Sequence, residues 1–557
     1  MVATFLSRWS NGPALQVDGW SASAVLVCCL ILGPIAALVV TAFGDSGGLW
    51  SHLVSTVLPR YVTNTLLLMA GVGVLAICFG VSTAWVVTRY EFPGRPLFEW
   101  MLLLPAAIPA YIIAYTYTDF LEYAGPVQSM LRDMFGWRRP ADYWFPEIRS
   151  LGGAMLVMAS VLYPYIYMVT RIAFRLTPAS LFEIAIVHNK SQFWLVGLPL
   201  ARPAIIAGLA LVLMEVVSDF GTVEYFAVET ITLGIFNVWL GMNNIVAAAQ
   251  ISLFGFVLIL SLLGLEIYAR SRQRYSGGTR KHTGLPNIVL STRGQIACIA
   301  VCMLPLLTGF VIPVGVLLKL LMSGPIGTQF EPVYGTILAS LGLAASAAVI
   351  IVLLSSLIVI AATYRGGVFV RQLAVAASTG YAIPGTMLSI GVLIFAGMID
   401  RSWSGLVGDQ RATLLLGGAG VLMTAYIVRF QAVGYGAMMS GIRRLPDNMM
   451  NASRVLGQGF GASLKRVVMP LLGSSMLAGG LLVFVDVMKE LPATLILHPF
   501  DFQTLAVQAH RLAADERLSE AAVPSLVLVG FFAAFWYHLF LSLYSTKCIM
   551  ILSFNIL

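Results

Sequence analysis

The segment Glu183-Ile184-Ala185-Ile186-Val187-His188-Asn189, followed by Leu198-Pro199, returns near the end of the chain as Asn451-Ala452-Ser453-Arg454-Val455-Leu456-Gly457, followed by Met469-Pro470. In both copies a polar loop precedes a proline, and the proline opens an apolar segment that contains a carboxylate. A constant offset of 271 residues relates Pro199 to Pro470 and Glu215 to Asp486. The chain is therefore a tandem duplication, and whatever this loop does is done twice.

The composition is that of a polytopic membrane protein. Hydrophobic residues make up 59% of the chain and charged residues only 10%, whereas roughly a quarter of the residues of soluble domains are charged. A helix needs about 20 mainly apolar residues to cross about 30 Å of hydrocarbon. Runs this long, apolar on all sides, favour helices over barrel strands. We predict an all-α protein with twelve spans, six per half: residues 21–43, 61–87, 97–121, 150–172, 202–223, 248–269, 294–320, 335–362, 372–397, 412–432, 471–488 and 523–544.

A hydrophilic segment separates the two sets of six runs. Residues 270–293 contain glycines and like charges, which is typical of a flexible linker, and we predict repeats over 1–269 and 294–557. An even number of spans per half gives the halves parallel topology. Lys and Arg residues, among which we count Arg429, are concentrated in alternate loops. This distribution predicts that both termini and both repeated loops are cytoplasmic. The first run is too long for a signal-peptide core, so we expect it to remain as an anchor.

Several function classes are excluded by composition. The net charge of +8 is explained by basic residues that set the topology, so we expect the lipid bilayer and no nucleic acid as a partner. Cysteines such as Cys28, Cys298 and Cys302 lie in apolar runs without further metal ligands, and we interpret them as packing residues. The chain contains no Gly-x-x-x-x-Gly-Lys-Ser/Thr motif, so any nucleotide must be bound by another chain.

Prolines interrupt two of the predicted spans. Ala107-Ile108-Pro109 in the third run matches Ala382-Ile383-Pro384 in the ninth, and Pro105 lies close by. Proline inside a span indicates a kink or a broken helix. We interpret these prolines as structural bends, with a hinge or pathway role as the alternative.

The repeated loop resembles the signature of permease subunits of binding-protein-dependent ABC importers with the type I fold. That signature is Glu-Ala-Ala in a cytoplasmic loop, Gly six residues after the Glu, and then a hydrophobic residue followed by Pro. The matching residues are Glu183, Ala185, Asn189 and Pro199 in the first copy and Asn451, Ala452, Gly457 and Pro470 in the second. The sequence segments 218–226 and 486–494 match that family branch too, and the whole chain resembles the fused, twelve-span permeases of the ferric iron importer family.

This resemblance implies a division of labour between chains. Loops 175–200 and 443–470 would dock onto two copies of an ABC ATPase, and a periplasmic solute-binding protein would deliver the solute. The chain itself would not be an enzyme and would hold no cofactor, since ATP and Mg belong to the ATPase. Its place would be the bacterial inner membrane. Ferric iron is the solute that the resemblance favours, while thiamine, phosphonate and polyamine importers have related permeases.

The chain departs from the family's pattern in three places. Asn189 stands where Gly is usual, although Asn tolerates a left-handed turn better than most residues. Asn451 replaces an acidic residue, which puts in doubt any ion pair that this carboxylate makes in the family. The tail at residues 547–552 is more apolar than we expect for a permease C-terminus, and we have no physical account of it.

Four acidic residues lie in or beside the apolar segments that follow the loops. Glu215 and Asp486 are equivalent in the repeat, and Asp219 and Glu490 follow four residues later on the same helical face. A carboxylate in a span costs roughly 2.5–3.5 kcal/mol and therefore faces a cavity or a partner. Our hypothesis is that these four line the translocation path or its outer gate, with Lys489 as a possible partner. The alternative is a structural role in pairing helices or anchoring at the interface.

Two other function classes stay open from the sequence. A secondary, ion-coupled transporter with two six-helix halves would need no ATPase, but it offers no reason for the twin loops. A membrane-embedded enzyme would need a nucleophile with a base or a pair of histidines at catalytic spacing, and the six histidines are scattered.

Overall fold

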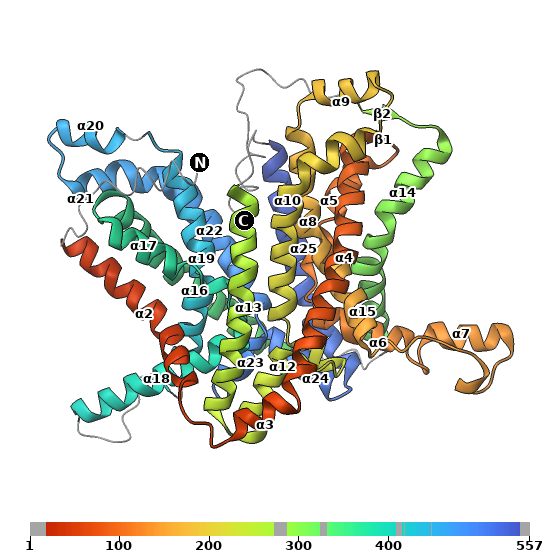
Figure 1. The fold of residues 1–557 in the computed structure, drawn as a ribbon, viewed down its shortest axis with the longest axis horizontal. Coiled ribbons are helices and arrows are strands. Elements are labelled where there is room, and N and C mark those ends of the chain that lie inside the picture. Colours follow the sequence, from red (N-terminus) through yellow and green to blue (C-terminus); the bar gives the residue numbers. More distant parts are fainter. Residues whose placement is uncertain are drawn as a thin grey trace.

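The computed structural model describes residues 18–271, 287–323, 331–407, 415–416, 418–446 and 448–545. Most of the predicted linker and the apolar tail at 547–552 lie outside these residues. We refer to residues 18–271 as the N-terminal half and residues 287–545 as the C-terminal half (Figure 1).

Helices coincide with all twelve predicted apolar runs. In the N-terminal half these are α2 (Gly19–Ala42), α4 (Leu58–Arg89), α5 (Arg95–Met101) with α6 (Ala110–Leu121), α8 (Leu151–Leu176), α10 (Leu198–Ser218) and α13 (Ile245–Ser271). In the C-terminal half they are α14 (Thr292–Leu306) with α15 (Ile312–Ser323), α16 (Glu331–Tyr364), α17 (Val368–Ala377) with α18 (Gly385–Val407), α19 (Ala419–Arg443), α22 (Met469–Lys489) and α25 (Leu518–Ser545). The all-α polytopic fold is confirmed.

Not every helix is long and apolar enough by itself to cross a membrane. Within the described part of the chain, nine helices are long and apolar enough to do so. The number is ten if the pair of helical segments 95–107 and 110–135, which is bent by 92°, forms one span. The two predicted spans outside this count coincide with α25 and with α19, whose apolar sequence is interrupted by Arg429 and Gln431.

The third and ninth predicted spans are broken near their prolines. A short 3₁₀ helix, η1 (Leu104–Ala107), precedes α6, and its counterpart η6 (Gly380–Ala382) precedes α18. Pro109 is the N-cap of α6 and has an extended backbone, and Pro384 lies between η6 and α18. Proline lacks the N–H that would continue a helix from the preceding residues. The kinks predicted from these prolines are therefore confirmed as breaks.

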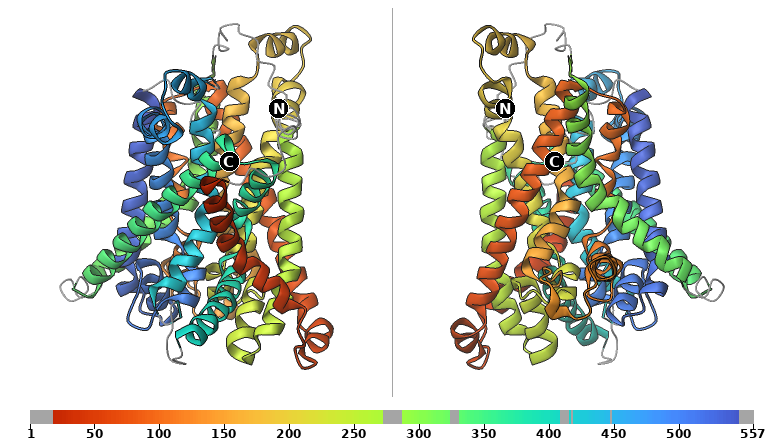
Figure 2. Two further views of the ribbon diagram at one scale, coloured as in Figure 1. Left: turned by 90° about the vertical axis from the view of Figure 1, so that its left-hand side faces the viewer. Right: turned by 90° about the vertical axis from the view of Figure 1, so that its right-hand side faces the viewer.

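The two halves share one packing pattern and are intertwined. Helices α4, α8 and α10 pack on one another in the N-terminal half, as α16, α19 and α22 do in the C-terminal half. The first helix of each half crosses over, because α2 packs on α17 and α18 whereas α14 and α15 pack on α4 and α6. Figure 2 shows α2 and α14–α15 running obliquely across opposite sides of the molecule.

The two repeated loops lie at the same end of the molecule, as parallel repeats require. The helices within these loops, α9 (Ala179–Val187) and α20 (Met449–Val455), project from one face (top of Figure 1), which we call the loop face. The opposite face, which we call the far face, carries α3 (Leu49–Ser55), α12 (Ile231–Phe236), α23 (Pro492–Leu497) and α24 (Leu505–Ala514).

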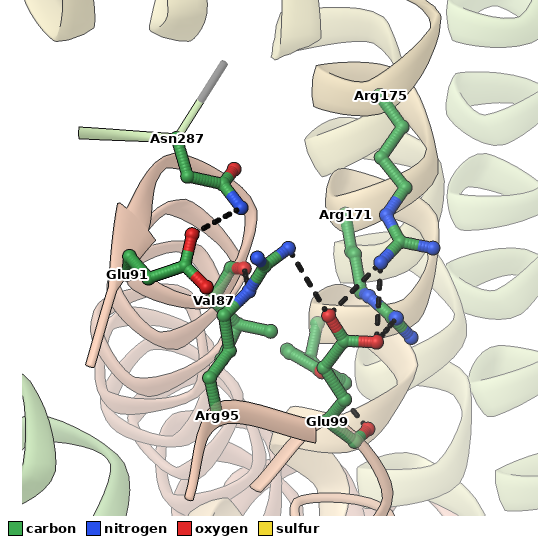
Figure 3. A network of polar contacts seen from close by, with 8 residues as sticks. Val87, Glu91, Arg95, Glu99, Arg171, Arg175 and Asn287 are labelled. Atoms are coloured by element: carbon green, nitrogen blue, oxygen red, sulfur yellow. Dashed lines mark hydrogen bonds and ion pairs between the residues drawn. The ribbon is translucent and has the colours of Figure 1, made fainter. Parts of the chain in front are cut away.

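A buried carboxylate ties helices together near the loop face (Figure 3). Glu99 of α5 is only 3% exposed and accepts hydrogen bonds from Arg171 and, at 3.0 Å, from Arg175 of α8. Arg95 lies 3.4 Å from the same carboxylate and also donates from Nε to the carbonyl of Val87. Burial of a carboxylate is tolerated only with such partners. This cluster fixes α5 and α8 at the point where the first loop begins.

The chain that enters the C-terminal half is tethered to the N-terminal half at the same place. Strand β1 (Tyr90–Glu91) pairs in parallel with β2 (Ile288–Val289). Asn287 donates a hydrogen bond to the Glu91 carboxylate at 3.3 Å, as Figure 3 shows. The two halves are therefore joined by backbone pairing at the loop face as well as by crossed helices.

Glycine allows the helices of each half to approach closely. A Cβ at Gly208 of α10 would lie 2.8 Å from Val169 Cγ2 and 3.0 Å from Ile166 Cα of α8. A Cβ at the equivalent Gly479 would lie 2.7 Å from the Cβ of Ala437 on α19. Small residues at helix contacts are the usual device for packing within membranes.

We predict that Gly208→Leu destabilises the protein by about 1–3 kcal/mol, because overpacking forces α8 and α10 apart. Thermal unfolding in detergent would show a lower midpoint. Gly342→Leu is the matched control, since Gly342 lies inside α16 and a Cβ there would meet no described atom within 4 Å. Equal midpoints for the two variants would contradict the close packing.

Candidate functional site

The first repeated loop is a short helix closed by a left-handed turn. Helix α9 ends before Asn189, whose φ of 51° is left-handed, and the N–H of Lys190 donates to the carbonyl of Ala185 at 2.9 Å. This bond satisfies a carbonyl that the end of the helix would leave free. The left-handed turn expected at Asn189 is confirmed. A π-helical turn, η3 (Phe193–Gly197), then leads into α10, and Pro199 lies in its first turn.

The second loop repeats this geometry with an insertion. Gly457 after α20 has a φ of 82°, and the N–H of Gln458 donates to the carbonyl of Ser453 at 3.2 Å. A short helix, α21 (Phe460–Ser463), then precedes the π-helical turn η7 (Leu464–Val468), and Pro470 lies in the first turn of α22. The additional residues of the second copy therefore form α21 without changing the turn or the proline start.

The inner side of each loop is anchored to the bundle. In the first loop the buried ring of Phe182 packs near Trp85 of α4, and Arg89 donates two hydrogen bonds to Gln192, at 2.9 and 2.6 Å. In the second loop, Arg365 lies over the ring of Phe460 at 4.3 Å from its centroid.

These anchoring residues were not predicted from the sequence, where the only signal for Phe182 and Phe460 is an aromatic residue inside each loop. Their contacts anchor each loop to the helix bundle.

The outer side of each loop presents apolar side chains to solvent. Val187 is 82% exposed and Val455 is 88% exposed. Further exposed apolar side chains in the loops are those of Ile184, Ile186, Trp194 and Leu456. Of the residues predicted from the signature, Glu183, Asn451 and Ala452 are exposed with them, whereas Ala185 is buried. Large exposed apolar patches mark sites that contact another protein, a membrane or a ligand.

A cavity lies at the centre of the molecule, between the two halves. Its volume is about 110 Å³, and it is lined by α10 and α22, the segments that directly follow the two loops. The structure places all four predicted acidic residues in its wall: Glu215, Asp219, Asp486 and Glu490. Lys489, expected as a possible partner, lines it as well, together with Tyr111, Tyr165, Tyr381 and Arg429.

Three of the four carboxylates have partners within their own half. Asp486 forms an ion pair with Lys489 at 2.8 Å. Asp219 accepts hydrogen bonds from the N–H and the hydroxyl of Thr222, at 2.9 and 3.1 Å, in the first turn of α11 (Gly221–Tyr225). Glu490 lies 3.2 Å from Arg429 and accepts a hydrogen bond from the N–H of Ala493. These contacts explain how the charges are tolerated between apolar helices.

Glu215 differs from the other three. It accepts a hydrogen bond from the hydroxyl of Tyr381, at 3.0 Å, across the boundary between the halves. Among the residues that the structure describes, it forms no ion pair. Its hydrogen bond therefore joins the two halves across the cavity.

Arg429 corrects an expectation from the sequence. We counted it among cytoplasmic loop residues because it lies close to the end of the predicted run 412–432. The structure places it inside α19, which continues to Arg443, and only 7% of its surface is exposed. Gly385 makes room for it, since a Cβ there would lie 2.7 Å from Arg429 Nη1 and from Glu490 Oε1. An arginine buried inside a span is retained because it is paired.

We predict that Arg429→Met is strongly destabilising, because removing one partner of a buried pair leaves the other charge unpaired, at a cost of about 3–5 kcal/mol. The double variant Arg429→Met with Glu490→Gln should recover much of the loss in thermal unfolding midpoint. Arg517→Met is the control, since Arg517 pairs with Glu520 on the surface. A double variant no more stable than Arg429→Met would contradict the pairing.

Comparisons with known proteins agree with this architecture, although no family model matches the chain. The Fe(3+)-transport system permease protein FbpB 2 of Haemophilus influenzae is 24% identical over 493 residues, which cover 85% of this chain and 88% of the relative. The sulfate transport system permease protein CysT of Salmonella typhimurium is 27% identical over 37% of this chain and 72% of its own length. The molybdenum transport system permease protein ModB of Escherichia coli is 27% identical over 35% of this chain and 87% of its own length.

The extent of the matches separates these relatives. The sulfate and molybdenum permeases match about a third of the chain over most of their own length, whereas the iron permease matches nearly all of it. This difference fits a chain that is itself a duplication. The resemblance of this chain to the fused permeases of ferric iron ABC importers is thereby confirmed.

Proposed function

We propose that the chain is the transmembrane permease subunit of an ATP-binding-cassette importer in the bacterial inner membrane, and that it passes ferric iron. The observation that carries the proposal is the pair of anchored, outwardly apolar loops on one face, each leading directly into a helix that lines the central cavity. A force applied to either loop reaches the cavity through one continuous segment.

The loops set the proposed partners and orientation. The loop face is cytoplasmic, as are both termini, and two copies of an ABC ATPase bind there, one on each loop. The left-handed turns at Asn189 and Gly457 and the helix starts at Pro199 and Pro470 shape the docking surfaces. The outward residues Glu183, Asn451 and Ala452 contribute to the contact, while Ala185 packs beneath it. ATP and Mg are bound by the ATPase, and this chain holds no cofactor.

The far face is then periplasmic and receives a solute-binding protein. In this proposal the repeats, residues 1–269 and 294–557, each supply one side of the translocation path, and residues 270–293 link them. A secondary transporter of the same shape would leave both apolar loops without a partner, which is why we favour the ATP-driven importer.

Two observations support iron as the solute. The iron permease matches 85% of this chain. In addition, four carboxylates and two basic side chains line the described cavity, so its wall has a net negative charge and favours cations. Sulfate, molybdate and phosphonate are anions and would meet repulsion from Glu215 and its neighbours.

We predict that Val187→Glu combined with Val455→Glu abolishes ATPase binding, because the new charges must be buried when the loops dock. The measurement is capture of the ATPase by the tagged chain from detergent-solubilised membranes. Val289→Glu is the control, since Val289 is exposed on the loop face outside both loops. Full capture by the double variant would argue against docking through the loops.

We also predict that Glu215→Gln slows uptake of radioactive ferric iron at least about tenfold, since it removes a cavity carboxylate that forms no ion pair with a described side chain and can attract a cation. ATPase capture should be unchanged, because the loops are untouched. Glu147→Gln, at an exposed position outside the cavity, should transport normally. If Glu215→Gln transported iron at the unsubstituted rate, the acidic pathway would have to be abandoned.

A further inference from the structure

A second contact between the halves lies beyond the central cavity, toward the far face. Glu224 of α11 and His510 of α24 are 286 residues apart in sequence, and their Oε2 and Nε2 atoms are 2.7 Å apart. An ionised carboxylate can only accept, so the imidazole donates this hydrogen bond. His510 is 5% exposed, whereas about a third of the Glu224 side chain is exposed. Water therefore reaches one partner of the contact.

His510 also packs on the wall of the central cavity. Its ring lies edge to face with Tyr111, at 5.9 Å between centroids, and near Phe220. Both of these residues line the central cavity. Gly221 brings the halves together at the same level, since a Cβ there would lie 2.7 Å from Tyr111 Cβ and 2.8 Å from Leu491 Cδ2.

The side chains that pack around His510 form one layer, and another cavity, of about 370 Å³, lies on the other side of this layer from the central cavity. Glu224 and His510 both line it, together with Trp239 of the π-helical turn η4 (Asn237–Gly241) and Arg511 and Asp515 at the end of α24. Its elements α12, α23 and α24 lie on the far face in Figure 1. One layer of side chains thus separates an outer cavity from the central one.

We propose that this layer, made by Tyr111, Phe220, Leu491 and His510, is the outer gate of the translocation path, and that the Glu224–His510 hydrogen bond is its latch. The latch joins the two halves, so separating them at the far face breaks it and connects the two cavities. Water can then replace His510 on the exposed side of Glu224. The inference rests on the proposed function only in treating the central cavity as a path for solute.

The test is thiol labelling from the far face. Ser218 lines the central cavity and is buried. Ser218→Cys, in a chain whose six native cysteines are replaced by alanine, reports entry of a membrane-impermeant thiol reagent added outside intact cells. We expect slow labelling with the latch intact. Glu224→Ala or His510→Ala should raise the labelling rate several-fold, up to about tenfold, as loss of one net hydrogen bond allows.

Two further variants separate a latch from a general loss of structure. Glu122→Ala removes an ion pair with Arg149, at 2.7 Å, that lies within the N-terminal half, and it should leave labelling slow. Exchanging the partners, Glu224→His with His510→Glu, keeps the contact and should restore slow labelling. Unchanged rates in both alanine variants, an equal increase with Glu122→Ala, or no rescue by the exchange would overturn the proposal. Labelling needs neither ATP nor solute, so its failure is distinguishable from a failure of ATPase capture.

Discussion

Charged side chains held between apolar helices are the constraint on which the rest of this structure depends. A charge inside a span is tolerated only when a partner or a cavity is available. Here α10 and α22 bring Glu215 and Asp486 to one central cavity, and Arg429 and Lys489 offset part of the acidic charge. The helices must then pack closely against one another, and the glycines at their contacts allow this close approach. Cavity, packing and charge are parts of one arrangement.

This arrangement links the two ends of the molecule. Each loop projects from the loop face and continues through a proline-started helix to the cavity. In each half a short helix follows directly and lies beside the gate layer: it begins at Gly221 in the N-terminal half and at Pro492 in the C-terminal half. Tilting α10 and α22 would therefore change the cavity and the contact between halves together. The crossed helices α2 and α14–α15 would hold the halves together during such a tilt. In this account alternating access is a rigid-body motion of two similar units.

Much of this could be predicted from residues that act locally. The run lengths gave the helices, Pro109 and Pro384 marked the broken spans, and Asn189 marked a left-handed turn. The equivalence of Glu215 with Asp486 followed from a constant offset. These features depend on backbone chemistry within a few residues, so a single sequence is enough to expose them.

What could not be predicted depends on contacts between distant segments. Arg429 looked like a loop residue because the space that Gly385 leaves for it is visible only in three dimensions. The same holds for Glu224 and His510, which meet from opposite halves. Among the described residues, fewer helices than predicted runs are apolar enough to count as spans, since polar residues inside α19 reduce its apolar character.

The central claim is that nucleotide hydrolysis on a partner drives this chain through its two loops. The most direct measurement is iron uptake into vesicles that contain the purified chain, with and without its ATPase, ATP and the loaded solute-binding protein. The account predicts uptake only when all of these are present. Uptake of the same extent by the chain alone, driven by an ion gradient, would contradict it.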